Sequence, residues 1–276
     1  MGLNNWFAKI SFAIRGRSRE VNFEESREKI AEESVPISTD LFGVTTAGER
    51  PANEDSILTV STDAYHLIAV ADGLGGHAAG EYASEMAICM LESEVAFAYH
   101  DQMDIPDIEL MLEDIYTDIH EAIESEGIGE REGMGTTLVS ALIRKNRAFI
   151  AHTGDSRAYL VREGVIPLTK DHSVVQSLID EGTIDAEKAR VHPLRNVLTH
   201  AMGGSFNVKT RYYDLNDGDL LLLCSDGFSG FVREEAIPGA VGGRTAEGAV
   251  KRLVKMAEEG ESDDNISVIL YRHGLL

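Results

Sequence analysis

Short apolar runs bounded by turn residues fill the chain from Leu41 onward, and they constrain the fold more than any other feature of the sequence. The runs at residues 56–60 and 65–71 are joined by a polar turn and predict an antiparallel hairpin. The run at 220–224 is apolar throughout, as expected for a strand that is buried on both faces. Further strands are predicted at residues 137–143, 148–152, 158–161 and 266–271.

Helical periodicity occurs in separate blocks between these strands. It predicts helices at about residues 81–99, 107–126, 173–181 and 245–259. Strands that come in blocks, with the helices segregated, favour antiparallel sheets flanked by helices over an alternating parallel fold. The expected class is therefore α+β, and the length of 276 residues fits a single main domain.

The composition excludes several classes of partner and location. Hydrophobic residues make up 43% of the chain, which is enough for a sizeable core, and the net charge of -22 would repel the backbone of a nucleic acid. No apolar stretch approaches the roughly 18 residues of a spanning helix. Cys89 and Cys224 have no ligand spacing and are predicted to be small buried hydrophobes, which favours a reducing, cytoplasmic location.

Residues 1–38 differ from the rest of the chain and are predicted to form a separate segment before a catalytic domain at 39–276. Apolar residues at positions 3, 6, 7, 10 and 14 have helical spacing, and the only charges among residues 1–19 are basic. Such a helix could lie on an anionic membrane or dock on a partner; the alternative is that it packs on its own domain or frays. Residues 18–39 are polar and acidic and are interpreted as a linker.

Five aspartates fall at the ends of predicted strands. Antiparallel pairing of the hairpin returns Asp55 and Asp72 to the same end, while Asp155 and Asp226 follow strands and Asp264 precedes the last one. A single acid in such a place is more commonly a turn or cap residue. Five clustered carboxylates would repel one another unless a cation neutralises them, and oxygen ligands without a His or Cys pattern favour Mg²⁺ or Mn²⁺.

Three other patterns are weaker. The glycine-rich stretch at 72–81 has the outline of a dinucleotide-binding turn, but Asp72 would oppose a pyrophosphate and the preceding strand belongs to a hairpin. The acidic stretch at 214–219 lacks the glycine position and final Glu of a calcium loop, so it is predicted to be a turn. Neither cysteine has an arginine six residues later, so a thiolate-dependent phosphatase is unsupported.

Six sequence elements, in order across about residues 41–272, resemble those of the metal-dependent protein serine/threonine phosphatases of type 2C in their bacterial or archaeal form. They are R-x-x-N-E-D-S at 50–56, D-G-x-G-G-H-x-x-G at 72–80, G-D-S-R-x-Y at 154–159, L-T-x-D-H-S at 168–173, S-D-G at 225–227 and D-N at 264–265. The resemblance implies a four-layer α-β-β-α sandwich with a binuclear Mn²⁺ or Mg²⁺ centre at one edge.

The resemblance also implies a role for each matching residue. Asp72 would bridge two metals, Gly73 would offer its carbonyl to one of them, and three further acids would hold the other: Asp55, Asp226 and Asp264. By the same resemblance Arg50 would bind phosphate, for which its planar fork is suited, whereas the alternative role for Arg50 is a structural salt bridge. Asp155 would be a ligand of a third, weaker metal. Members of this family often carry an Asp where this chain has Gly230, which puts that third metal in doubt.

The expected function is hydrolysis of phosphoserine and phosphothreonine in proteins by a water that the two metals activate, opposing Ser/Thr kinases. Residues 174–202 resemble a flap that selects substrates. His77, His152 and His172 are candidates for protonating the leaving group, and the alternative for each is a structural histidine. The alternative function is a catalytically silent module that binds phosphoproteins. A monomer is expected, and the acidic balance fits either basic phosphosites or a high-salt organism.

Overall fold

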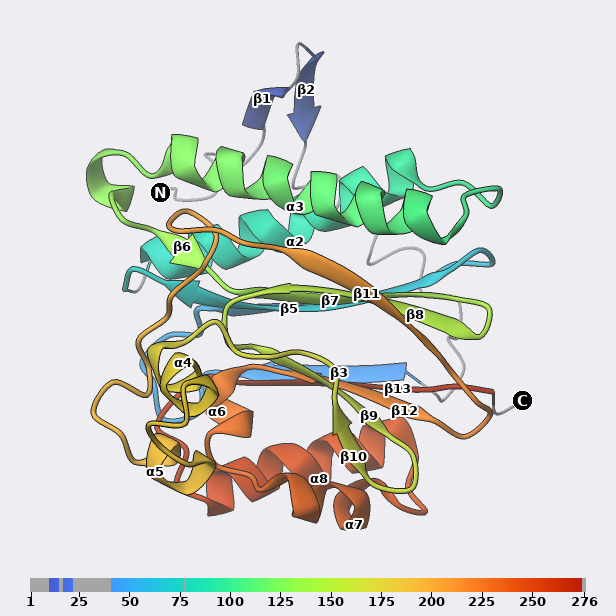
Figure 1. The fold of residues 1–276 in the computed structure, drawn as a ribbon. Helices are drawn as coiled ribbons and strands as arrows, with labels where there is room; N and C mark the ends of the chain where they lie inside the picture. Colours follow the sequence, from blue (N-terminus) through green and yellow to red (C-terminus); the bar gives the residue numbers. More distant parts are fainter. Residues whose placement is uncertain (1–9, 15–16, 22–40, 77, 275–276) are drawn as a thin grey trace, which may run out of the picture.

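The computed structural model of the chain describes residues 10–14, 17–21, 41–76 and 78–274, and two antiparallel sheets packed face to face form its centre. One layer of helices covers the outer face of each sheet (Figure 1). This arrangement confirms the expected α-β-β-α sandwich. In the described part of the chain, no helix is both long enough and apolar enough to cross a membrane.

The six-stranded sheet has the order β11-β8-β7-β5-β4, with β6 paired to β5, and the five-stranded sheet has the order β10-β9-β12-β13-β3. The strands of the first sheet are β4 (Asp55–Ser61), β5 (His66–Leu74), β6 (Gly135–Thr136), β7 (Leu138–Arg144), β8 (Arg147–Thr153) and β11 (Lys209–Asp214). Those of the second are β3 (Leu41–Thr46), β9 (Arg157–Val161), β10 (Val165–Pro167), β12 (Leu220–Cys224) and β13 (Ile266–Arg272).

Helices α2 (Ala78–Ala98) and α3 (Ile105–Glu126) pack on the six-stranded sheet, and α7 (Ile237–Val241) and α8 (Ala246–Glu259) lie on the other side. The start of α3 is fixed by its sequence, because the Asp104 side chain accepts a hydrogen bond from the Asp107 backbone N–H and the Asp107 side chain accepts one from the Asp104 backbone N–H. Five short helices complete the described fold. Three are α-helices, α4 (Val174–Asp180), α5 (Ala186–Arg190) and α6 (Asp226–Ser229), and two are 3-10 helices, η1 (Gly129–Arg131) and η2 (Glu234–Ala236).

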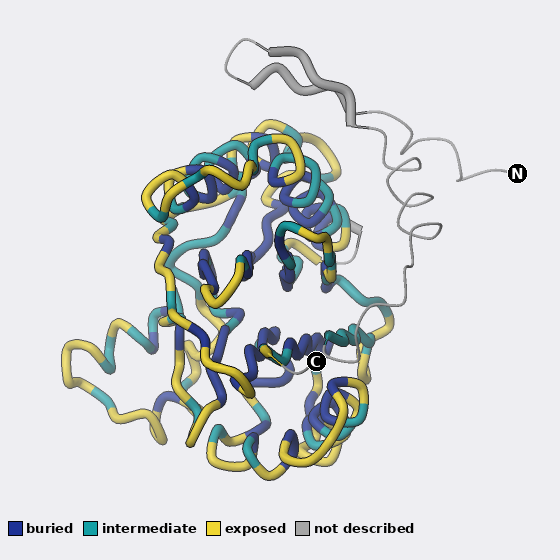
Figure 2. Tube along the Cα trace, turned by 90° about the vertical axis from the view of Figure 1, so that its right-hand side faces the viewer, coloured by how far each residue is buried: buried dark blue, intermediate teal, exposed yellow. Residues whose placement is uncertain are grey.

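Strand β5 shows why the central runs are apolar on every residue. Ile68 and Val70 point into the core between the two sheets, whereas Leu67 and Ala69 lie in the core beneath α2 and α3. Both faces of the sheet are therefore buried, as the dark strands in Figure 2 show. Strand β12 divides in the same way between the inner core and the core under α8, which confirms the prediction for residues 220–224.

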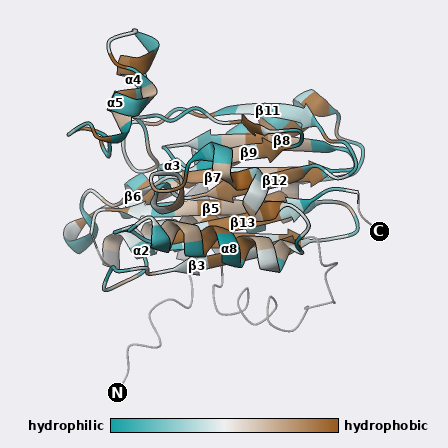
Figure 3. Ribbon diagram, turned by 90° about the horizontal axis from the view of Figure 1, so that it is seen from below, coloured by the Kyte–Doolittle hydropathy of each residue, from teal (hydrophilic) through white to brown (hydrophobic). Residues whose placement is uncertain are grey.

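The short helices and outer strands were harder to predict. The structure confirms the predicted helices and strands of the core. Seven other elements were not expected, and each is short or lies at an edge, where periodicity carries little signal: α5, α6, α7, β3, β6, β10 and β11. The pair α4 and α5 projects from the body of the molecule in Figure 3, where the central strands carry mostly hydrophobic residues.

Two expectations are wrong in part. Residues Ile10–Ile14 form strand β1, paired with β2 (Arg17–Val21), instead of the end of an amphipathic helix. The alternation of Ile10, Phe12 and Ile14 with small residues, together with β-branched side chains, favours a strand. Residues 1–9 and 22–40 lie outside the described part. Cys224 is buried as expected, but Cys89 is only half-buried.

Candidate metal centre

Strand pairing brings the predicted acids to one end of the sandwich. Asp55 lies directly opposite Asp72 in the β4–β5 register, which confirms the pairing expected from the sequence. Asp226 follows β12 and Asp264 precedes β13, and these two strands are antiparallel neighbours in the second sheet. A pocket of about 230 Å³ opens at this end, and its lining includes Arg50, Asp72, Gly73, Asp155, Asp226 and Asp264.

Asp55 is the most deeply placed of these acids. It is 6% exposed, and the Ser267 hydroxyl donates a hydrogen bond of 2.6 Å to its carboxylate. Burial raises the pKa of Asp55 to about 7, against the lowering effect of hydrogen bonds from Ser267 and Ser225. The carboxylates of Asp226 and Asp264 add to the rise.

The backbone of Asp72 is held by two neighbouring threonines. The Asp72 N–H donates to the Thr137 hydroxyl at 3.0 Å, and the Thr136 hydroxyl donates to the Asp72 carbonyl at 2.9 Å. Burial raises the pKa of the Asp72 carboxyl well above its usual range, and the nearby Asp55 and Asp226 raise it further. The threonines therefore fix the backbone of a residue whose carboxylate charge is opposed by its surroundings.

On the second sheet, Asp226 and Asp264 face the same pocket with one cation beside them. Burial raises the pKa of Asp226 to about 6, and the Asp264 carboxylate is the next cause. Arg50 donates to the Asp264 carboxylate at 2.9 Å and to the Asp263 carbonyl at 2.7 Å, with 48% of its side chain exposed. The structure therefore contains the salt bridge that was the alternative role for Arg50.

Two glycines of the motifs are required by close packing. A Cβ on Gly73 would lie 2.3 Å from the Gly80 carbonyl oxygen and 2.6 Å from that of Glu54. At Gly227, a Cβ would lie 2.0 Å from the Asn265 carbonyl oxygen. Since side-chain carbons do not approach this closely, both positions need glycine for the strand ends and the helices that follow to meet.

The donor set fits divalent cations. Carboxylate and carbonyl oxygens are the ligands that Mg²⁺ and Mn²⁺ prefer. Burial and the neighbouring carboxylates raise the pKa of Asp55, Asp72 and Asp226, so a cation bound among these acids would favour their ionised forms. Within the described ranges, no three His, Cys, Asp or Glu side chains already converge on a single point as metal ligands. The fit therefore rests on oxygen chemistry and uncompensated charge.

Comparison with known proteins decides the family. The family model described as Protein phosphatase 2C matches residues 43–270. The chain belongs to the protein phosphatase 2C family. It is 36% identical over 234 residues to the serine/threonine phosphatase stp of Listeria innocua, covering 82% of this chain and 92% of that protein.

A second relative is the serine/threonine protein phosphatase PstP of Mycobacterium tuberculosis, 38% identical over 227 residues, which are 80% of this chain but only 42% of PstP. This chain thus spans less than half of that relative. A solved structure of the PstP catalytic domain in complex with two manganese ions has a TM-score of 0.71 and 33% identity, and the match covers 84% of this chain and 96% of that one.

Asp155, the residue assigned to a third metal by family resemblance, lines the same pocket. Burial and the Asp226 carboxylate raise its pKa well above the usual range. At the position where family members often carry an aspartate, the carbonyl of Gly230 accepts a hydrogen bond of 2.7 Å from Arg190 of α5. A flap residue therefore contacts the backbone at the place where a further acid is missing.

The candidate histidines lie beside this site in a stack. His152 and His172 have ring centroids 4.7 Å apart, and His200, which was not predicted, packs edge-on against His172 at 5.2 Å. Burial, followed by the neighbouring His152 and His200, lowers the pKa of His172 to about 4. His172 accepts a hydrogen bond from the Gly154 N–H, next to Asp155. His77 lies outside the described residues.

Several residues of the site were missed by sequence reasoning. Asn196 and Leu198 of the predicted flap line the pocket, and Asn265 accepts a hydrogen bond of 2.8 Å from the Glu54 N–H. Arg157 and Asp171, from two separate family motifs, pair with each other at 2.7 Å, so those motif positions are structural. The D-N motif at 264–265 was the sequence signal that could have identified Asn265 as a site residue. A single Thr, Ser or Asn outside such a motif gives no comparable signal in the sequence.

Proposed function

We propose that this chain is a protein serine/threonine phosphatase that hydrolyses phosphoserine and phosphothreonine monoesters with divalent metal ions, opposing Ser/Thr kinases. The observation that carries the proposal is the set of carboxylates with raised pKa at one end of the sandwich, with Arg50 at its rim. Family membership and the phosphatase names of the relatives support it. In this assignment residues 39–276 are the catalytic domain and 1–38 a separate segment.

Asp55, Asp72, Asp226, Asp264 and the Gly73 carbonyl would hold two Mn²⁺ or Mg²⁺ ions. The ions would lower the pKa of a bound water and stabilise negative charge on the phosphoryl oxygens. The manganese ions in the PstP catalytic domain support this composition. Asp155 is our candidate for a weaker third site, without a carboxylate at Gly230 to assist it.

Arg50 would capture the phosphoryl group. Its side chain is 48% exposed at the pocket rim, and its guanidinium is suited to bidentate binding of two phosphoryl oxygens. In the structure it is paired with Asp264, so Arg50 would exchange this partner for the substrate when a cation neutralises Asp264. The arginine would thus hold the phosphoryl group toward the acids without a change of backbone.

The cysteines offer no competing nucleophile. Burial raises the pKa of the Cys224 thiol to about 12, so it stays protonated at neutral pH, and Cys89 lies within α2, away from the metal-site lining.

The backbone N–H and carbonyl of Asp72 are held by Thr137 and Thr136. Rigid placement of this carboxylate would save reorganisation when charge develops during in-line attack by water.

The test is phosphate release from a phosphothreonine peptide by the full chain with Mn²⁺, with Mg²⁺ and with a chelator. We expect turnover with at least one ion, loss of turnover on chelation and recovery when the ion is restored. Tight, stoichiometric binding of the phosphopeptide without phosphate release would instead indicate a silent binding module and contradict the proposal.

A further inference from the structure

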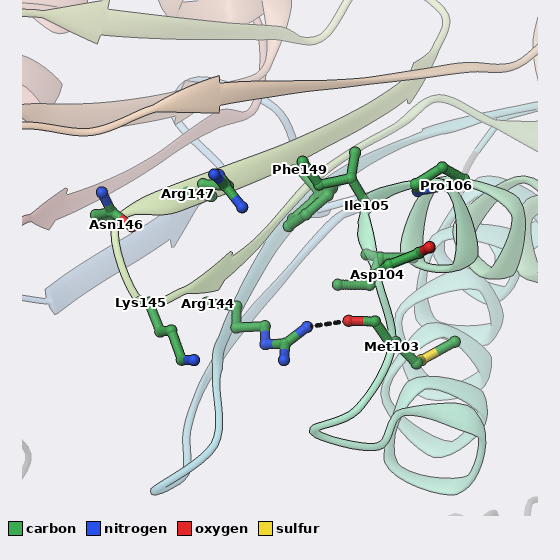
Figure 4. A pocket seen from close by; sticks show the side chains of 10 residues that line it. Met103, Asp104, Ile105, Pro106, Arg144, Lys145, Asn146, Arg147 and Phe149 are labelled. Atoms are coloured by element: carbon green, nitrogen blue, oxygen red, sulfur yellow. Dashed lines mark hydrogen bonds between the residues drawn. The ribbon is translucent and has the colours of Figure 1, made fainter.

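A second cavity, of about 390 Å³, lies between the start of α3 and the β7–β8 turn (Figure 4). Its apolar lining includes Met103, Ile105, Pro106 and Phe149, and its rim carries Arg144, Lys145 and Arg147. We call this site the basic groove. None of its lining residues lines the pocket of the metal centre.

Charge sets the basic groove apart from the rest of the molecule. Residues 144–147 (RKNR) form the only four-residue window of the sequence with three Lys or Arg residues, in a chain with a net charge of -22. Arg144 uses its guanidinium on two neutral groups, the carbonyl oxygens of Met103, at 2.5 Å, and Asp101. Lys145 forms no ion pair with another described residue.

Two acids near the groove, Asp104 and Asp214, already have hydrogen-bond or ion-pair partners. The Asp104 carboxylate lines the groove but accepts a hydrogen bond of 3.0 Å from the Asp107 N–H, as the cap of α3. Asp214 pairs with Arg147 at 3.1 Å. Two cations, Arg144 and Lys145, are therefore left beside an apolar floor without a carboxylate partner among the described residues.

We propose that the basic groove docks a segment of the substrate phosphoprotein that carries an apolar side chain next to carboxylates. The apolar side chain would pack on Met103 and Ile105, and the carboxylates would face Arg144 and Lys145. This inference rests on the proposed phosphatase function and adds a second point of substrate recognition. A small anion fits the groove less well than such a segment, because it would have no apolar group to pack on the apolar lining.

The strand register gives the spacing between the two sites. Thr137 holds Asp72 at the metal end, and β7 runs from Leu138 to Arg144 at the groove. At about 3.3 Å per strand residue this places the sites roughly 20 Å apart along the sheet. A docked segment would lie at least about six extended residues from the phosphorylated residue, and a flexible linker of about twelve residues has a matching average span. It would raise the effective concentration of the phosphoryl group at the metals, so KM would change and kcat would not.

The experiment uses the full chain with Mn²⁺ and two phosphothreonine peptides. Both carry the same phosphosite and a twelve-residue Gly/Ser linker; one ends in Leu-Glu-Glu-Glu and the other in Ser-Gln-Gln-Gln. We expect the acidic tail to lower KM by about five-fold at equal kcat, the scale of one favourable charge contact. Lys145→Glu should abolish the difference and Lys145→Arg should keep it, while all three proteins hydrolyse the Ser-Gln-Gln-Gln peptide equally.

Lys251→Glu on the exposed surface of α8 is the matched charge control and should behave like the unaltered chain. If Lys145→Glu fails to fold, Lys145→Gln removes the same charge without adding a negative one and should reduce the difference between the peptides. Equal KM for both peptides, or a difference that survives Lys145→Glu, would overturn the proposal. Sedimentation velocity adds a second outcome. If the chain forms a dimer that Lys145→Glu abolishes while KM is equal for both peptides, the groove binds a second copy of the chain and the proposal is overturned.

Failure of the proposed function would look different, since neither peptide would then be hydrolysed. Fluorescence anisotropy of the labelled Leu-Glu-Glu-Glu peptide measures docking without turnover. Binding that is several-fold weaker for the Ser-Gln-Gln-Gln peptide and for Lys145→Glu would still support the groove, and equal binding would reject it.

Discussion

The two ends of strand β12 place aspartates in opposite surroundings. Asp219, just before the strand, is 3% exposed and accepts hydrogen bonds from Arg162 at 2.8 and 2.5 Å and from the Asn216 N–H at 2.7 Å. Asp226, just after it, is half-buried among other carboxylates. Burial acts to raise the pKa of Asp219, but Arg162 outweighs it and the pKa falls, whereas that of Asp226 rises to about 6.

The comparison separates a structural acid from a functional one on a single strand. An acid that is buried with its own cation has a compensated charge, and the fold loses stability when one partner of the pair is removed. An acid that is buried among like charges destabilises the fold until a cation arrives from outside. Four substitutions or conditions test this difference, from the largest expected effect to the smallest.

Asp226→Asn should have the largest effect. It removes a proposed metal ligand, so we expect kcat/KM on a phosphothreonine peptide to fall by at least about 10³-fold. The amide has nearly the same shape and removes a repelling charge, so the midpoint of thermal unfolding in chelator should stay equal or rise. Activity near that of the unaltered protein in a folded variant would contradict the assignment.

Metal-free protein should lose stability as the pH rises. The pKa of Asp226 is raised from 3.8 to about 6 and that of Asp55 to about 7, so the folded state holds these protons more tightly than the unfolded chain does. Their contribution is fully present below about pH 4 and is lost as the pH rises through 6 and 7. Asp226 alone corresponds to roughly 3 kcal/mol.

Thermal unfolding followed from pH 5 to pH 8, with chelator and with Mn²⁺, measures this contribution. Bound cations favour the ionised carboxylates, so Mn²⁺ should remove or reverse the slope. Identical pH profiles with and without Mn²⁺ would show that the acids and the ion are not coupled.

Asp219→Asn should change stability and leave chemistry alone. The substitution weakens two hydrogen bonds from Arg162, so we expect the free energy of unfolding to fall by about 2 kcal/mol. Because Asp219 lies at the other end of β12 from the metal centre, kcat and KM should stay unchanged at a temperature where the variant is folded. A loss of turnover as large as that of Asp226→Asn would erase the distinction between the two ends.

Arg50→Lys should have the smallest effect of the four tests. Lysine keeps the charge but loses the planar fork, so we expect kcat/KM to fall by about ten-fold, mostly through KM. Unfolding should be little affected, since 48% of the Arg50 side chain is exposed and a partly exposed pair contributes little to stability. A loss of stability comparable to that of Asp219→Asn, with no change in KM, would make Arg50 structural.

Sequence reasoning reached the core strands and the paired position of Asp55 and Asp72, because strand periodicity and hairpin symmetry are local. It did not reach Ser267, which lies 212 residues from Asp55 in the sequence and donates to its carboxylate. It also missed the pairing of Arg157 with Asp171, which depends on how β9 and the following loop meet. Contacts of this kind follow from tertiary packing, which no local pattern of residues specifies.

The most direct test of the central claim is a calorimetric titration of metal-free protein with Mn²⁺ at pH 7, with Asp226→Asn and Asp219→Asn titrated beside it. We expect two ions to bind per chain, unchanged by Asp219→Asn and reduced in number or affinity by Asp226→Asn. Absence of Mn²⁺ binding, or the same isotherm for Asp226→Asn as for the unaltered protein, would contradict it.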